Sequence, residues 1–125
     1  METNKRPRPK RLPGETIRMS TGCGHLYMTM TVDEKSLPFE LFATLGRAGG
    51  CATCQLEGLT RSISLGLRSG VPIEEYIDQL KGLRCPSPSI DEGTPILSCP
   101  DAMTKAITTL LGSKISKEEV KDGNK

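Results

Sequence analysis

Aromatic residues are scarce in this sequence, which has no tryptophan, two tyrosines and two phenylalanines among its 125 residues. Proteins that bind single-stranded nucleic acid stack the bases on aromatic rings, and this chain has too few rings for that class of binding. Long hydrophobic runs are also absent, since no apolar stretch approaches the ~20 residues that span a membrane. The N-terminus has no apolar segment of the signal-peptide type. We therefore expect a cytoplasmic protein with no membrane partner.

Net charge is small, because 17 Lys and Arg residues oppose 15 Asp and Glu residues. Residues 1–11 hold five basic residues and one glutamate, a local charge of +4, which leaves −2 for the rest of the chain. Prolines 7, 9 and 13 exclude a helix, so residues 1–15 are predicted to form an extended basic arm. Its candidate partner-binding residues, suited to an acidic protein surface or to weak contact with a nucleic-acid backbone, are Arg6, Arg8, Lys10 and Arg11. The alternative is a disordered leader that only aids solubility.

Alternating apolar and polar residues predict strands in the first half of the chain. Residues 26–32 and 39–45 both alternate with the period of a half-buried strand, and a turn through residues 33–38 separates them. These two runs are expected to form an antiparallel hairpin. Ile17 and Met19 indicate a third, shorter strand before it.

Helical spacing follows a glycine-rich break at residues 46–50. Apolar residues from 52 to 67 predict a long helix that ends at Gly70, Pro72 begins a short one, and a third runs from Pro100 to Gly112. A Pro- and Ser-rich loop is expected over residues 84–95. Strands followed by helices predict one α+β domain over residues 16–112, with three helices on one face of a small antiparallel sheet of about three strands. Residues 113–125 are predicted to be a flexible charged tail.

Five cysteines in a cytoplasmic protein favour metal ligands or redox thiols over disulfides. Cys23 lies between two glycines before the central strand, Cys85 lies in the Pro-rich loop, and Cys51 and Cys99 begin helices. Thiols at helix N-termini are expected to have lowered pKa values. Two ligands from helix starts and two from loops could complete a tetrahedral thiolate site.

Cysteine spacing alone leaves three alternatives open. The chain has a single Cys-x-x-Cys pair, Cys51 and Cys54, whereas two such pairs are typical of zinc sites. The first alternative is a structural zinc site, and the second is a redox dithiol at Cys51 and Cys54. The third is that the cysteines are small buried side chains without chemistry.

Five ordered motifs make the chain similar to a known family. They are Thr21-Gly22-Cys23-Gly24, Leu45-Gly46-Arg47-Ala48-Gly49-Gly50-Cys51, Leu65-Gly66-Leu67-Arg68-Ser69-Gly70, Arg84-Cys85-Pro86-Ser87-Pro88 and Ser98-Cys99-Pro100-Asp101-Ala102. This set resembles the TSCPD domain, which occurs at the C-terminal end of adenosylcobalamin-dependent (class II) ribonucleotide reductases and as short stand-alone proteins. Two departures are Leu97, where the family has Thr, and the additional Cys54.

The resemblance implies that the metal ligands are Cys23, Cys51, Cys85 and Cys99. Cys54, one turn into the helix from Cys51, is a candidate to replace Cys85. The order of elements is also similar, more weakly, to that of U-type iron–sulfur cluster scaffolds. Those proteins have an Asp two residues after the first Cys, where this chain has His25, so His25 is a candidate ligand or a hydrogen-bond donor to a thiolate. The alternative for His25 is an ordinary half-exposed polar residue.

The resemblance further implies a module accessory to a ribonucleoside-diphosphate reductase, in the synthesis of deoxyribonucleotides for DNA. The chain is too short for the reductase barrel, a cobalamin site and a radical cysteine, and residues 113–125 contain no Cys pair of the thiol-relay type. It is therefore not expected to be catalytic alone, and adenosylcobalamin would reside on an associated catalytic chain. The expected cofactor is structural zinc. The alternatives are an iron–sulfur or sulfur-handling scaffold and a thiol–disulfide protein.

Overall fold

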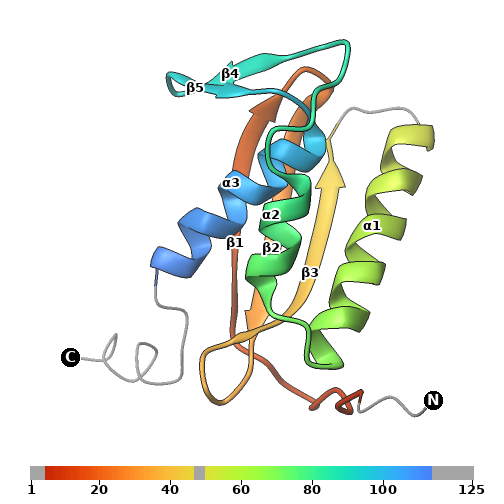
Figure 1. Ribbon diagram of the computed structural model, residues 1–125, viewed down its shortest axis with the longest axis vertical. Helices are drawn as coiled ribbons and strands as arrows, with labels where there is room; N and C mark the ends of the chain where they lie inside the picture. Colours follow the sequence, from red (N-terminus) through yellow and green to blue (C-terminus); the bar gives the residue numbers. More distant parts are fainter. Residues whose placement is uncertain (1–4, 47–49, 114–125) are drawn as a thin grey trace.

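The computed structural model describes residues 5–46 and 50–113, which form an α+β fold (Figure 1). Its elements in chain order are β1 (Gly14–Thr21), β2 (Gly24–Val32), β3 (Pro38–Leu45), α1 (Gly50–Arg68), α2 (Ile73–Leu80), β4 (Ser89–Asp91), β5 (Thr94–Ile96) and α3 (Cys99–Gly112). The first three strands form an antiparallel sheet in the order β1-β2-β3, and the helices cover one of its faces. This confirms the predicted fold class.

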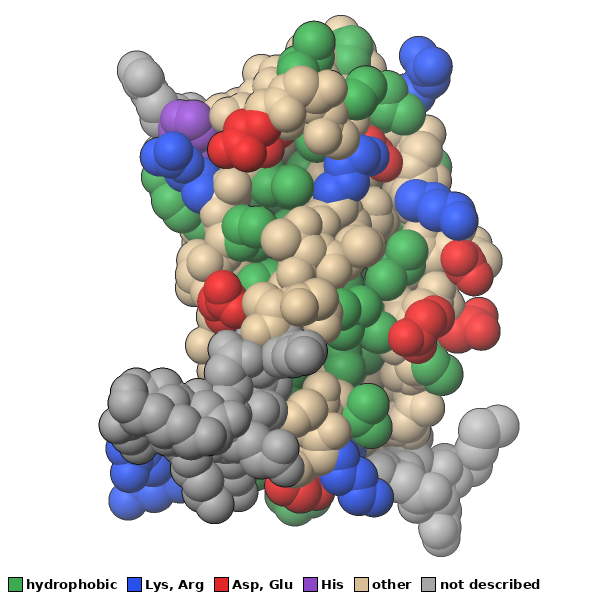
Figure 2. Space-filling view, turned by 90° about the vertical axis from the view of Figure 1, so that its left-hand side faces the viewer, with side chains coloured by type: hydrophobic (Ala, Val, Ile, Leu, Met, Phe, Trp, Pro, Cys, Tyr) green, Lys and Arg blue, Asp and Glu red, His purple; other side chains and the backbone are tan. Residues whose placement is uncertain are grey.

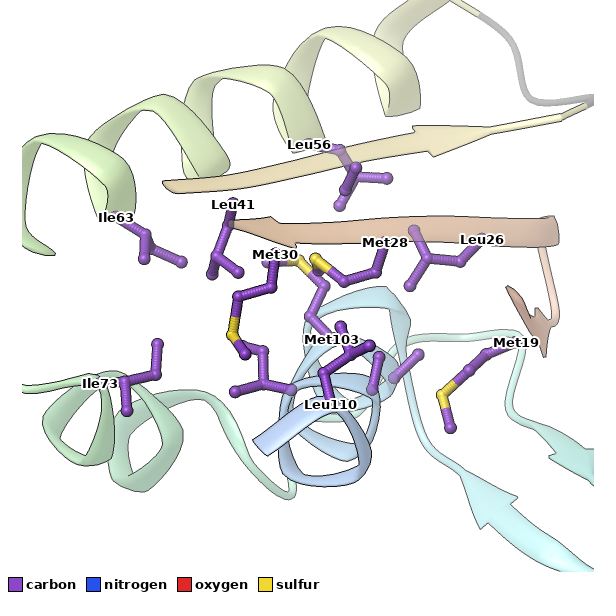
Figure 3. Close-up of a cluster of buried hydrophobic side chains, with 14 of the residues drawn as sticks. Met19, Leu26, Met28, Met30, Leu41, Leu56, Ile63, Ile73, Met103 and Leu110 are labelled. Carbon is purple, nitrogen blue, oxygen red and sulfur yellow. The ribbon is translucent and has the colours of Figure 1, made fainter. Parts of the chain in front are cut away.

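The core lies between the sheet and the helices, and methionines fill much of it (Figure 3). Leu26, Met28 and Met30 project from alternate positions of β2 toward Met103 and Leu110 of α3, and all five are nearly inaccessible to solvent. Flexible methionine side chains fill irregular gaps, which suits a core that has few aromatic residues. The period-2 pattern of β2 therefore determines which face of the sheet is covered.

Helix α1 covers the free edge of β3. Leu56, Ile63 and Leu67 form its buried stripe at helical spacing. The Ser64 hydroxyl accepts a hydrogen bond from the Leu41 N–H at 2.9 Å and donates one to the Leu41 carbonyl at 3.1 Å. Because exposed strand edges pair with other chains, this side chain protects the edge of the sheet at that position.

The predicted loop over residues 84–95 is wrong in part, because it contains the short hairpin of β4 and β5. Glu92 and Gly93 form its turn with φ values of 46° and 83°, and positive φ at both central turn positions twists the chain in the sense that two-residue hairpins require. The Asp91 carboxylate accepts a hydrogen bond from the Ser20 N–H of β1 at 2.8 Å. A strand of three residues is too short for its alternation of apolar and polar side chains to be recognised in the sequence. Strand β1 is also longer than the sequence indicated.

Residues 5–13 of the basic arm contact the end of the domain where α1 finishes, whereas residues 14 and 15, also predicted as arm, begin β1. The Arg6 guanidinium donates to the Asp33 carboxylate at 2.7 Å, and its backbone N–H donates to the Arg68 carbonyl at 2.9 Å. The Arg6 and Arg68 guanidinium carbons lie 4.8 and 5.4 Å from the centre of the Phe39 ring, within the range of cation–π attraction. Arg8 pairs with Glu40 at 2.9 Å. Both arginines thus have partners in their own chain.

The remaining predictions for the ends of the chain lie partly outside the described residues. These are the first four residues of the arm and the tail from residue 114 onward. Lys10 and Arg11 are described and are exposed to solvent. Within residues 5–46 and 50–113, no helix combines the length and the apolar character needed to cross a membrane.

Candidate metal centre

Three of the four cysteines that the resemblance selects, Cys23, Cys85 and Cys99, line one cavity of about 370 Å³. The cavity lies at the end of the sheet where β1 turns into β2 and where α3 begins, and α1 borders it. Its remaining wall is mostly apolar and consists of Leu45, Ala52, Gln55, Leu56, Leu59 and Pro100. The fold therefore brings Cys23 to the same cavity as Cys85, although the two residues are 62 positions apart in the sequence.

Cys23 lies in the tight turn between β1 and β2. Its N–H donates to the Thr21 hydroxyl at 3.1 Å, and that hydroxyl donates to the Gly24 carbonyl at 2.8 Å. Gly22 lies directly against the loop that carries Cys85, since a Cβ at this position would be 1.7 Å from the Ser87 carbonyl oxygen. The absence of a side chain at Gly22 thus lets the Cys23 turn and the Cys85 loop approach each other.

Cys85 is half-buried and is held by two backbone groups. Its N–H donates to the Leu97 carbonyl at 3.0 Å, which continues the pairing between the two chain segments next to the β4–β5 hairpin. Its sulfur accepts a hydrogen bond from the Ser87 N–H at 3.4 Å. These two bonds fix the Cys85 residue beside the segment that leads to Cys99.

Cys99 is the first residue of α3, and Ser98 caps this helix by accepting a hydrogen bond from the Asp101 N–H. We expected the helix N-terminus to lower the pKa of Cys99, and that prediction is wrong. Burial raises the pKa, and the charges of Cys23 and Cys85 raise it further, while the Thr21 hydroxyl opposes them. Burial is the largest of these causes, and the position of Cys99 at a helix start does not reveal it.

The other candidate ligands lie outside this cavity wall. Cys51 and Cys54 are exposed on the first turn of α1, although Ala52 between them lines the cavity. His25 is exposed on β2, where it alternates with the buried Leu26, so its side chain lies on the uncovered face of the sheet; it is the purple side chain in Figure 2. In the parts of the chain that the structure describes, no three Cys, His, Asp or Glu side chains converge closely enough to bind a metal ion directly.

Sequence analysis missed Asp101, a carboxylate only 1% exposed that lies two residues after Cys99. It accepts hydrogen bonds from the Gly82 N–H at 2.8 Å, the Leu97 N–H at 3.0 Å and the Lys105 ammonium at 2.6 Å. Burial raises its pKa, but these three donors outweigh burial and leave the pKa lowered. The i,i+4 spacing of Asp101 and Lys105 was a signal for the ion pair, whereas the two backbone donors had none in the sequence.

Comparison with known families accounts for the motifs around this cavity. The TSCPD domain matches the chain over residues 2–111. The chain belongs to the TSCPD domain family. The match covers the sheet, all three helices and the arm, so the five motifs of this TSCPD domain belong to one folded unit.

Curated relatives of this TSCPD domain are much longer proteins. Vitamin B12-dependent ribonucleotide reductases of Streptantibioticus cattleyicolor, Streptomyces clavuligerus and Streptomyces coelicolor are each 28% identical to it over 76 residues. The aligned segment is 61% of this chain but only 13% of the first protein and 8% of the other two. No solved structure matches the chain at a significant level.

Proposed function

We propose that this TSCPD domain is an accessory module of a ribonucleotide reductase, which binds the catalytic chain and supports the supply of deoxyribonucleotides. The observation that carries the proposal is the family match over residues 2–111, together with relatives named as vitamin B12-dependent reductases. Because the aligned segment is a small fraction of those relatives, the catalytic machinery and adenosylcobalamin belong to the partner chain in this proposal. The domain itself is not catalytic.

We further propose that the domain holds a structural zinc ion through Cys23, Cys85 and Cys99, with Cys51 as the fourth ligand. The donor set fits zinc, since thiolates are its preferred ligands in structural sites. The shared cavity supports the proposal, because it gathers thiol side chains from three separate segments of the chain. When bound, zinc would contribute folding free energy and leave no open position for a substrate.

The basic arm is assigned the role of docking on an acidic surface of the catalytic chain. Arg6 and Arg8 pair with Asp33 and Glu40 of their own domain, so the cations that support docking are the exposed Lys10 and Arg11. Ion pairs at such a surface are sensitive to salt. The double charge reversal of Lys10 and Arg11 to Glu should therefore weaken capture of the catalytic chain, and the Arg8→Ala variant should weaken it less.

Metal analysis and affinity capture test the two parts of the proposal separately. Protein purified under reducing conditions should contain one zinc per chain, and immobilised protein should capture a reductase catalytic chain from a cell lysate. A colourless protein without metal would overturn the zinc site, and brown protein with iron after anaerobic reconstitution would support the U-type scaffold instead. Capture of no reductase chain, together with unchanged reductase activity after gene deletion, would overturn the accessory role.

One observation favours a second function, thiol–disulfide exchange. Cys51 and Cys54 are both exposed on the first turn of α1, in the Cys-x-x-Cys arrangement that suits exchange with another protein. In that case the protein should reduce insulin disulfides, and Cys54→Ser should abolish this activity. Zinc bound with Cys51 as a ligand would exclude it, because a metal-bound thiolate is not free to attack a disulfide.

A further inference from the structure

The buried carboxylate of Asp101 joins the two chain segments that carry Cys85 and Cys99. One oxygen accepts from the Gly82 N–H at 2.8 Å, and the other accepts from the Leu97 N–H at 3.0 Å. Gly82 lies three residues before Cys85, and Leu97 lies two residues before Cys99. The carboxylate thus binds the segment that precedes each of the two thiols, and Asp101 itself lies in the first turn of α3.

A second set of bonds continues this connection to the sulfur-bearing residues. The Leu97 carbonyl accepts a hydrogen bond from the Cys85 N–H at 3.0 Å. Leu97 thus donates to Asp101 through its N–H and binds Cys85 through its carbonyl. Ser98, between Leu97 and Cys99, accepts the N–H of Asp101 at 3.1 Å. Leu97 and Ser98, the two residues before Cys99, are therefore both hydrogen-bonded to Asp101.

We propose that Asp101 is the positioning residue of the metal centre: it holds the Cys85 loop against the start of α3, so that the two thiols share one cavity. This inference rests on the proposed metal-binding function for its purpose, although the juxtaposition of the two segments is independent of any metal. Asp101 acts through the cysteines rather than as a ligand. Its oxygens are occupied by three donors, and it is absent from the cavity wall formed by the described residues.

Lys105 has a lesser part in this arrangement. Its ammonium group reaches the carboxylate at 2.6 Å, but its side chain is 31% exposed, so solvent can replace it. The two backbone N–H groups belong to the segments themselves, and Asp101 is the acceptor that they share, so loss of the carboxylate removes the link between them. Loss of the carboxylate should therefore release both segments, whereas loss of the lysine should leave them in place.

Substitution Asp101→Asn tests the proposal with little change in side-chain size, because an amide offers one acceptor oxygen where the carboxylate offers two. At saturating cobalt(II), used as a spectroscopic probe in place of zinc, the thiolate-to-metal absorption should fall by roughly one thiolate in four, since Cys85 no longer reaches the metal. Zinc affinity, measured by competition with a chelator, should fall about 10- to 100-fold.

Two matched variants separate positioning from general loss of stability. Lys105→Met should keep the full cobalt absorption and change zinc affinity less than about threefold, within the range of an exposed ion pair. Leu110→Ala removes a buried core side chain near the opposite end of α3 from Cys99, so its cobalt absorption at saturation should equal that of the unmodified protein. An unchanged absorption in Asp101→Asn, or the same reduction in Leu110→Ala, would overturn the proposal.

A metal-free measurement distinguishes failure of this inference from failure of the zinc proposal. With Cys23, Cys51 and Cys54 replaced by Ser, oxidised glutathione can convert Cys85 and Cys99 to a disulfide and leave as two reduced glutathione molecules. The equilibrium gives the effective concentration of one thiol at the other. Asp101→Asn should lower it at least tenfold, and an equal value in both proteins would contradict the positioning role. If the unmodified protein binds neither zinc nor cobalt, the metal proposal fails and this result alone decides the role of Asp101.

Discussion

The two ends of the three-stranded sheet differ in how their functional groups are satisfied. At the end that the arm covers, the Asp33 carboxylate is paired with Arg6, and the Phe39 ring lies under two guanidinium groups. At the other end, three thiols face one cavity whose described wall contains no basic side chain. The first end is complete as polypeptide alone. The second gathers three sulfur atoms around one cavity without a charged partner among the described residues that line it, which is the physical basis for placing the proposed zinc there.

The largest expected effect is at the thiol end. Cys99→Ser should release zinc and lower the melting temperature, because bound zinc contributes folding free energy that the metal-free domain lacks. Cys23→Ser and Cys51→Ser should act in the same way. Zinc content per chain and thermal melting check this result. A melt unchanged by Cys99→Ser would show that the thiol end, like the arm end, is complete without a metal.

Cys54→Ser is the control for that series, since Cys54 is exposed and outside the cavity wall. It should keep its zinc and its melting temperature. Cys85→Ser should lose zinc, with a weaker effect than Cys99→Ser if Cys54 can substitute for Cys85. If Cys54→Ser loses the metal and Cys85→Ser keeps it, Cys54 is the ligand and the assignment from the family resemblance is wrong at Cys85.

A smaller effect is expected from Gly22→Ala, which tests how closely the Cys23 turn and the Cys85 loop must approach. The new Cβ would lie 1.7 Å from the Ser87 carbonyl oxygen, so backbone must move. The free energy of unfolding should fall by about 2–3 kcal/mol, and zinc affinity should fall with it. Gly58→Ala in α1 is the matched control: its Cβ meets nothing within 4 Å, so stability should rise by about 0.5–1 kcal/mol. Urea denaturation measures both.

At the arm end, Arg6→Ala should lower the free energy of unfolding by about 1–2 kcal/mol, because Asp33 loses its ion pair and Phe39 loses a cation–π contact. The exposure of the Arg6 side chain, 40%, keeps the loss below that of a fully buried pair. Zinc content should not change, in contrast to the cysteine variants. Lys10→Ala, an exposed position on the same arm, should leave both stability and zinc unchanged. Unchanged stability in both Arg6→Ala and Lys10→Ala would mean that the arm contributes nothing to folding.

The smallest effect is a pH dependence at the arm end. Burial raises the pKa of Asp33, but the Arg6 guanidinium and the N–H groups of Leu37 and Lys35 outweigh burial and lower it overall. Because the folded-state pKa lies below the unfolded value of about 4, this contribution is complete above that pH and is lost as pH falls toward the folded pKa. In chelator-treated protein, Asp33→Asn should lose less stability than the unmodified protein between about pH 5 and pH 3. Parallel pH profiles in urea denaturation would contradict the assignment.

Much of the fold was predictable because its signals are local. The alternation over residues 26–32 and 39–45 is present in the strands β2 and β3, and the helical spacing from Ala52 to Leu67 lies within α1. The same alternation places His25 on the face opposite Leu26, away from the helices, so the strand period was already a sequence argument against its approach to the cavity. The β4–β5 hairpin escaped prediction because its strands are three residues long and include Pro95.

The candidate site was predictable only in its parts. Motif glycines and prolines marked Cys23, Cys85 and Cys99 as residues at the ends of elements, and the structure places these three around one cavity. The pKa of Cys99 was mispredicted, since the helix start is visible in the sequence but burial and neighbouring thiols are not. Asp101 was missed for the same reason: two of its three donors are backbone groups of distant residues.

By itself, then, the sequence determined the long strands and the three helices, the covered face of the sheet and the family motifs, because period, turn residues and motif spacing depend on neighbours along the chain. The tertiary structure alone decided which groups meet. Thr21 and Cys99 are 78 residues apart and Arg6 and Arg68 are 62 apart, yet each pair is in contact. Such contacts depend on how the helices pack on the sheet, and no local pattern encodes them. That packing places three thiols around one cavity at one end of the sheet and a satisfied ion pair at the other.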